Sequence, residues 1–142
     1  MIEVNNLTNN PVDEELLKHL GKYILAQEGV KKEVEVSVAI VGEDEIRKLN
    51  KIYRKKDKPT NVLSFQGDSK FVFPCSKIKQ LGEIVICPSQ IIGEDKIDLK
   101  QVFVHGFLHL LGYDHQTKKD LKIMETKQKK YLTSFFKKYG SA

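Results

Sequence analysis

Three of the four histidines of this chain lie within eleven residues, as His105, His109 and His115. Residues four apart in a helix share one face and lie about 6 Å apart along the axis, so the imidazoles of His105 and His109 can bind one ion. Gly112 can end such a helix in a left-handed conformation and turn the chain back, which brings His115 toward the same point. Three neutral imidazoles that leave a fourth position open are typical of a catalytic zinc site. The spacing therefore predicts one zinc ion per chain, and leaves nickel, cobalt and iron as alternatives.

The fourth histidine, His19, and the residue after His105, Gly106, limit what the cluster can be. A single histidine on an apolar helix is more often a hydrogen-bonded core residue than a ligand, and this is our interpretation of His19. The clustered histidines differ, because their segment is too apolar to bury imidazoles without a partner. In the peptidase motif H-E-x-x-H the residue after the first histidine is the general base, but here it is Gly106. We expect this glycine to leave room for a bulky substrate beside the metal, and peptide hydrolysis is disfavoured.

The elements that position these histidines can be predicted from hydrophobic periodicity. Four helices are predicted, from the carboxylates at 13–15 to Gly29, from Gly42 to Pro59, over 99–111 and over 117–139. Strands are predicted over 2–6, 33–41, 62–65, 71–73 and 82–87, and a loop over 74–80. Strands mixed with helices predict an α+β or mixed-sheet domain.

The helices differ in how their apolar residues are distributed. The segment 99–111 is apolar almost all round, so we expect it to be buried on most sides. The second helix has one apolar side, formed by Ile46, Leu49 and Tyr53. The last helix has lysines opposite a row formed by Leu121, Met124, Gln128, Leu132, Phe135 and Tyr139.

The composition is that of one ordinary globular domain. The chain has 142 residues, of which 40% are hydrophobic and 30% are charged, so we expect a single domain over residues 1–142. No apolar run approaches the roughly 18 residues that cross a bilayer, and the first residues lack the pattern of a signal peptide. Cys75 and Cys87 do not form a C-x-x-C pair, which excludes a disulfide scaffold. We therefore expect a cytosolic protein with both cysteines reduced and no membrane partner.

The positive charge is concentrated in two segments. The net charge is only +5, but residues 47–58 carry +6 and residues 116–142 carry +6, which leaves −7 for the rest of the chain. Two basic segments on an acidic body are typical of a surface that binds a polyanion, because neutralised phosphates release their counterions. The alternative is that the lysines only solvate the outer faces of two helices.

Four motifs of this sequence resemble those of a known protein family. The run H-G-F-L-H-L-L-G-Y-D-H at 105–115 resembles the signature of the endoribonuclease YbeY family, bacterial metal-dependent RNases tied to ribosomal RNA maturation. Three further blocks follow the order and spacing of that family, L-N-x-x-Y-R at 49–54, T-N-V-L-S-F at 60–65 and L-G-E-I-V-I at 81–86. The resemblance covers most of the chain. It departs at Asn61, where the family usually has Asp, so that the hydrogen-bonding shape is kept and a charge is lost.

The resemblance implies a fold, an activity and a site. The fold would be α+β, with helices packed on a four-stranded mixed sheet. The activity would be a single-strand-specific endoribonuclease that uses a zinc-activated water and acts in rRNA maturation, near the 3′ end of the small-subunit RNA, and in ribosome biogenesis and quality control. His105, His109 and His115 would bind the zinc. Arg54 would face the cleft as a catalytic residue, because an arginine can hold a phosphate bidentately.

The sequence also allows other roles for two residues and other functions for the protein. Arg54 can instead be an exposed charge at a helix end, and Asp114 can either orient a histidine or cap a turn. The protein can be a zinc-stabilised ribosome-assembly factor that binds RNA without cutting it, or a zinc hydrolase of another substrate class. RNA is the expected partner, and ribosomal or ribosome-associated proteins are further candidates.

Overall fold

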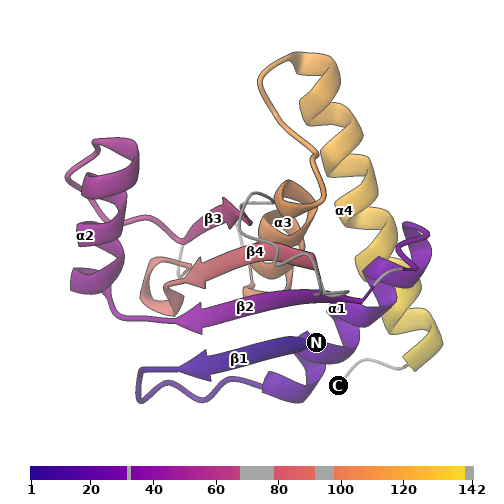
Figure 1. The fold of residues 1–142 in the computed structure, drawn as a ribbon, viewed down its shortest axis with the longest axis horizontal. Coiled ribbons are helices and arrows are strands. Elements are labelled where there is room, and N and C mark those ends of the chain that lie inside the picture. Colours follow the sequence, from indigo (N-terminus) through magenta and orange to yellow (C-terminus); the bar gives the residue numbers. More distant parts are fainter. Residues whose placement is uncertain (32, 68–78, 92–97, 140–142) are drawn as a thin grey trace.

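The sheet that organises this protein has the strand order β1-β2-β4-β3 (Figure 1). The computed structural model describes residues 1–31, 33–67, 79–91 and 98–139. Its strands are β1 (Ile2–Asn6), β2 (Val34–Ile40), β3 (Val62–Gln66) and β4 (Lys79–Ile86). Its helices are α1 (Glu14–Gln27), α2 (Glu43–Arg54), α3 (Leu99–Leu110) and α4 (Lys118–Tyr139), with a 3-10 turn, η2, at Pro88–Gln90.

The sheet is mixed, as the resemblance implied. Strands β1, β2 and β4 are parallel, and β3 pairs antiparallel with β4 at one edge. In β2 the residues Val34, Val36, Val38 and Ile40 are buried and the residues between them are not, so the predicted alternation is confirmed. The predicted α+β class and the four-stranded mixed sheet are therefore correct.

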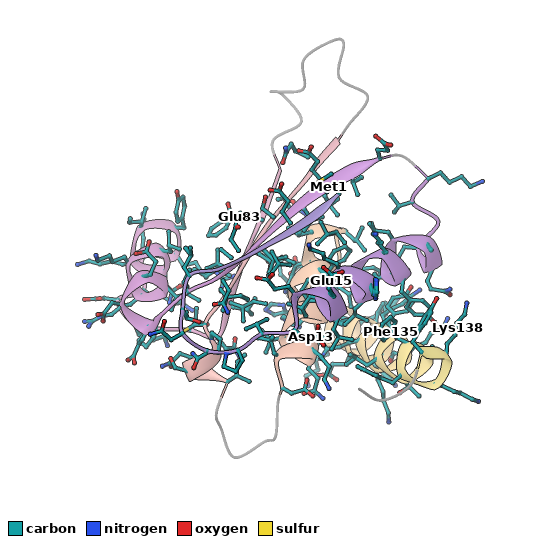
Figure 2. The ribbon with its side chains drawn as sticks, turned by 90° about the horizontal axis from the view of Figure 1, so that it is seen from below. Met1, Asp13, Glu15, Glu83, Phe135 and Lys138 are labelled. Carbon is teal, nitrogen blue, oxygen red and sulfur yellow. The ribbon has the colours of Figure 1, made fainter. Side chains whose placement is uncertain are left out.

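The two faces of the sheet are covered differently. Helices α1, α3 and α4 pack on one face and form the main hydrophobic core with β1, β2 and β4. Helix α2 contributes to a separate smaller cluster, formed by Val41, Ile46, Leu63, Val85 and Cys87. Figure 2 shows Asp13, the N-cap residue of α1, and Glu15 of α1 beside Phe135 and Lys138 of α4, and Glu83 on the other side of the sheet. Helix α3, which carries His105 and His109, thus lies inside the larger layer.

Helix α3 is the most buried helix among the described residues. Its buried side chains come from nearly all directions around its axis, and they include Val102, Phe103, Val104, Phe107, Leu108 and Leu110. Its first turn is closed by a capping box, in which the Asp98 carboxylate accepts from the Gln101 backbone N–H and the Gln101 side chain accepts from the Asp98 N–H. The prediction of a helix buried on most sides is confirmed.

Several boundaries and faces differ from the sequence predictions. Helix α2 ends at Arg54, five residues before Pro59, because Lys55 adopts a left-handed conformation with φ of 57°. Tyr53 of α2 is 63% exposed rather than packed in the core. The loop predicted over 74–80 is wrong at its end, since β4 already begins at Lys79. The strand predicted over 71–73, and Cys75, lie outside the described residues.

The apolar row predicted for α4 is only partly correct. Met124 and Phe135 are buried, but Leu121 is 40% exposed and Tyr139 is 60% exposed, while Tyr131, which lies outside the predicted row, is 2% exposed. Leu121 lies in the first turn of α4, which extends beyond the sheet and the other helices in Figure 1, and Tyr139 is the last residue of the helix. The two exposed members of the row therefore lie at the two ends of the helix.

Gly82 allows β3 and α3 to approach β4 closely. Its φ is +147°, and a Cβ atom there would lie 2.2 Å from the Phe65 carbonyl oxygen and 2.6 Å from Leu110 Cδ2. We expect Gly82→Ala to lower the free energy of unfolding by about 3 kcal/mol, measured by urea denaturation. Gly42→Ala is the control, because no atom lies within 4 Å of its Cβ position, and a loss below about 1 kcal/mol is expected there. Equal losses in both variants would contradict this account.

None of the described helices is both long and apolar enough to cross a membrane.

Candidate metal centre

The three clustered histidines converge on one point. His109 Nε2 lies 3.2 Å from His105 Nε2 and 3.2 Å from His115 Nδ1. One ring nitrogen from each histidine falls within 4.8 Å of the others. His105 and His109 are partly buried and His115 is exposed, so the group is open to solvent on one side. Among the described residues, these three histidines form a cluster of metal-binding side chains that can hold one ion.

The local sequence explains this convergence. His105 and His109 are one turn apart on α3, which is fixed by its buried neighbours. After Leu110 the chain turns through Gly112, whose φ is +104°. The Gly112 N–H donates to the His109 carbonyl at 3.0 Å and the Tyr113 N–H donates to the Leu108 carbonyl at 3.1 Å, which is a Schellman motif. The turn that the glycine predicts is therefore present, and it brings His115 back to the helix.

The electrostatic setting of α3 keeps the ligand nitrogens available. Burial lowers the pKa of His105, and the neighbouring positive charges of His109, His115 and Arg54 lower it further, against a hydrogen bond to Gln128 that raises it. Burial likewise lowers the pKa of His109, with His115 and Arg54 acting in the same direction. A neutral imidazole is the form that binds a metal. Three imidazoles with facing nitrogens, of which His105 and His109 have a lowered pKa, fit a divalent ion that accepts nitrogen ligands, such as zinc.

Arg54 lies within electrostatic reach of this cluster. It is the last residue of α2, is exposed, and its charge contributes to the lowered pKa values of both helical histidines. The chain just after it is folded back on α2, because the buried Asn50 side chain donates to the Lys58 carbonyl at 2.8 Å and Arg47 pairs with Asp57 at 2.8 Å. These contacts hold the segment that follows Arg54 against α2.

Gln128 of α4 is a residue of this site that the sequence did not assign to it. Its side chain is near enough to raise the pKa of His105, and it lines a cavity of about 220 Å³ beside that histidine. The cavity is lined by Asn61, Val62, Gln101, Val102, His105 and Gln128. One signal was present, since Gln128 is the single polar residue in the apolar row predicted for α4. Three amide side chains thus surround one face of the first histidine.

The structure corrects the interpretations of Gly106 and His19, and it favours one of the two roles considered for Asp114. Gly106 is buried against the sheet, and a Cβ there would lie 3.0 Å from Ile84 Cγ2, so the glycine allows close packing of α3 and does not leave room for substrate. His19 is exposed on α1, away from the cluster, so its interpretation as a core residue is wrong. The Asp114 carboxylate accepts from the His115 backbone N–H at 2.7 Å, which favours its turn-capping role.

The turn that carries His115 is tied to two helices through Glu28, the residue at the end of α1. The Tyr113 hydroxyl donates to Glu28 Oε1 at 2.6 Å, the Tyr131 hydroxyl donates to Oε2, and Lys127 Nζ lies 3.4 Å from Oε2. Burial alone would raise the Glu28 pKa, but the two hydroxyls and the Lys127 charge outweigh it, so this pKa is lowered from 4.5. Burial, together with the hydrogen bond to the Glu28 carboxylate and its charge, raises the pKa of Tyr131 to about 12, although Lys127 acts in the opposite direction.

The Glu28 contacts predict a loss of stability in acid. A carboxylate whose pKa is lower in the folded state stabilises that state above its unfolded pKa and loses this contribution as the pH falls through the folded pKa. The free energy of unfolding of the wild type should therefore exceed that of Glu28→Gln from neutral pH down to about pH 4.5, and the difference should shrink below that pH. Urea denaturation at a series of pH values measures it. A difference that stays constant from pH 7 to pH 3 would contradict the assignment.

The fold and the site together define an α+β protein whose central helix carries a candidate three-histidine metal centre. Residues 3–136 match the family model described as Endoribonuclease YbeY, and the chain belongs to that family.

Individual relatives agree with this assignment. A protein named Endoribonuclease YbeY from Bacillus subtilis (strain 168) is 40% identical over 87% of this chain and 88% of its own length. Its namesake from Bacillus licheniformis is 36% identical over 95% of this chain and 94% of its own length. The solution structure of TM1509 from Thermotoga maritima has a TM-score of 0.60 and 31% identity, and covers 98% of this chain and 91% of that one. The resemblance first seen in the sequence is thus confirmed.

Proposed function

We propose that residues 1–142 form a single-strand-specific metallo-endoribonuclease domain that hydrolyses RNA phosphodiester bonds. The observation that carries the proposal is the convergence of three imidazoles within 4.8 Å in a chain of the endoribonuclease YbeY family. His105, His109 and His115 would hold one zinc ion. When bound, zinc would lower the pKa of a water molecule toward ~7 and polarise a phosphoryl oxygen.

Arg54 is the residue that we assign to the substrate. A guanidinium presents a planar fork of donors that can hold a phosphate bidentately, and it stabilises the negative charge that develops during displacement at phosphorus. Its exposed position, close enough to affect the pKa of His105 and His109, supports this role. The same positive charge also disfavours protonation of the two ligands.

The distribution of charge supports RNA as the substrate. The segment of +6 over residues 47–58 contains Arg54, and the other segment of +6 begins directly after His115. In the structure these are residues 47–54 of α2 with the following loop, and α4, whose lysines are mostly exposed. Basic side chains on both sides of the cluster can neutralise successive phosphates of one strand.

The cellular role that we propose follows the family resemblance. The substrate would be ribosomal RNA, near the 3′ end of the small-subunit species, and the enzyme would act in ribosome biogenesis and quality control. Ribosomal or ribosome-associated proteins would be its protein partners, and the cytoplasm its location.

Removal of the metal tests the activity. Purified protein should cleave a labelled single-stranded RNA, lose that cleavage after treatment with a chelator, and regain it when zinc is added to one equivalent. A duplex of the same sequence should be cleaved much more slowly. Cleavage that continues at the same rate in the metal-free protein would overturn the proposal.

The same experiment separates the alternatives. A non-cleaving protein that binds both zinc and the single-stranded RNA would be the zinc-stabilised assembly factor. If polyuridylate does not compete with a hydrolysed small-molecule or peptide substrate, the protein would be a zinc hydrolase of another class.

A further inference from the structure

The three histidines are not held equally firmly by the fold. His105 and His109 are partly buried on α3, whose neighbours on the helix are almost fully buried. His115 is exposed and lies beyond the end of the helix, in the turn that follows Gly112. The position of the third imidazole therefore depends on whatever fixes this turn.

Tyr113, which lies in this turn, makes a strong polar contact with Glu28, a residue outside the turn. The Tyr113 hydroxyl donates to Glu28 Oε1 at 2.6 Å, although the two residues are 85 positions apart. The Glu28 side chain is only 13% exposed, and its other oxygen accepts from the Tyr131 hydroxyl and pairs with Lys127. A hydrogen bond to a charged, partly buried acceptor is about twice as strong as one between neutral groups. Glu28 thus connects the turn to α1 and α4 at once.

Glu28 is in an unfavourable place for the stability of α1 alone. It is the C-terminal cap of that helix, where the helix dipole presents partial negative charge, and the last turn of α1 contains no basic residue. A carboxylate there is repelled by its own helix. The groups that compensate it lie elsewhere, on the turn and on α4. The location of Glu28 is explained by these contacts rather than by helix capping.

We infer that Glu28, acting through the Tyr113 hydroxyl, is a positioning residue for the metal centre that sets the place of His115. The inference rests on the proposed binding of a metal by the three histidines. Without the contact, His105 and His109 stay where α3 holds them, and His115 must be ordered at the moment of binding. Outer contacts that orient ligands typically change metal affinity by about 10- to 100-fold when they are removed.

The test measures zinc affinity by competition with a chromophoric chelator. Glu28→Met removes both acceptor oxygens, and Tyr113→Phe removes only the hydroxyl and keeps the fold. Both variants should bind zinc about 10- to 100-fold more weakly. Glu28→Gln keeps a carbonyl oxygen that can accept from Tyr113, so it should recover part of the loss. Tyr131→Phe is the matched control, since it removes a hydroxyl from the same carboxylate without touching the turn, and it should bind zinc within about threefold of the wild type.

A double-mutant cycle distinguishes positioning from a general loss of stability. In a His115→Ala background the third ligand is absent, so Tyr113→Phe should cause no further loss of zinc affinity. An unchanged affinity in Tyr113→Phe, or an equal loss with and without His115, would overturn the inference while the metal centre stands. A wild-type protein that binds no zinc would overturn the proposed function itself, and the inference with it.

Discussion

Replacing His109 with alanine is expected to abolish stoichiometric zinc binding and to slow RNA cleavage by at least about a thousandfold. His109 is the central member of the cluster, because its Nε2 atom lies 3.2 Å from a ring nitrogen of each of the other two histidines. Without it, the remaining pair comes from a helix and a turn with no ligand between them. A metal ion contributes several kcal/mol of charge stabilisation in such sites, and each 1.36 kcal/mol is a factor of ten in rate.

The measurements are elemental analysis after dialysis and the cleavage rate of a single-stranded oligonucleotide. His19→Ala is the matched control, because it removes an imidazole that is exposed on α1 and outside the cluster. It should retain one zinc per chain and the wild-type rate. Cleavage that persists unchanged in His109→Ala would mean a contaminating nuclease and would contradict the enzyme assignment.

The second large effect is expected at Arg54. Arg54→Ala should lower the cleavage rate by about 10²- to 10³-fold, the usual loss when one donor to a developing negative charge is removed. The zinc content should not change, because the residue is at the end of α2 and supplies no ligand. Arg54→Lys should recover only a small part of the rate, since an ammonium is a point charge and cannot make two parallel hydrogen bonds to a phosphate.

Lys48→Ala is the control for this variant. Lys48 is exposed on the same helix and carries the same charge, so its loss should weaken RNA binding slightly and leave the rate at saturating RNA unchanged. If Arg54→Ala behaves like Lys48→Ala, Arg54 is a general phosphate contact and not a catalytic residue. If it loses zinc, its role is structural.

The parts of the site that could be predicted are those encoded locally. His105 and His109 are related by one helical turn, and Gly112 marks the point where the chain reverses, so neighbouring residues were sufficient. The same holds for β2, whose alternation reports directly on which face is buried. Such patterns describe the relation of a residue to its own element.

The parts that could not be predicted depend on which elements meet. Glu28 and Tyr113 are 85 residues apart, and nothing in either segment indicates the other. The exposed Leu121 and the buried Tyr131 show the same limit, because a helical pattern does not say which turns of a 22-residue helix lie over the body. Gly106 was recognised as small, but that its missing side chain accommodates Ile84 requires the distance between α3 and the sheet.

The residues of this candidate site belong to elements that pack in two separate hydrophobic clusters. The helix that carries His105 and His109 packs in the main core, whereas Arg54 is the last residue of a helix that packs on the small cluster of Ile46, Leu63 and Val85. Figure 1 shows α2 at the end of the sheet toward which β1, β2 and β4 point, apart from α1 and α4. Changes in the small cluster can therefore shift Arg54, which we propose to hold the substrate, while the three histidines stay in place. If the proposed roles hold, substrate preference and metal binding can vary independently in this architecture.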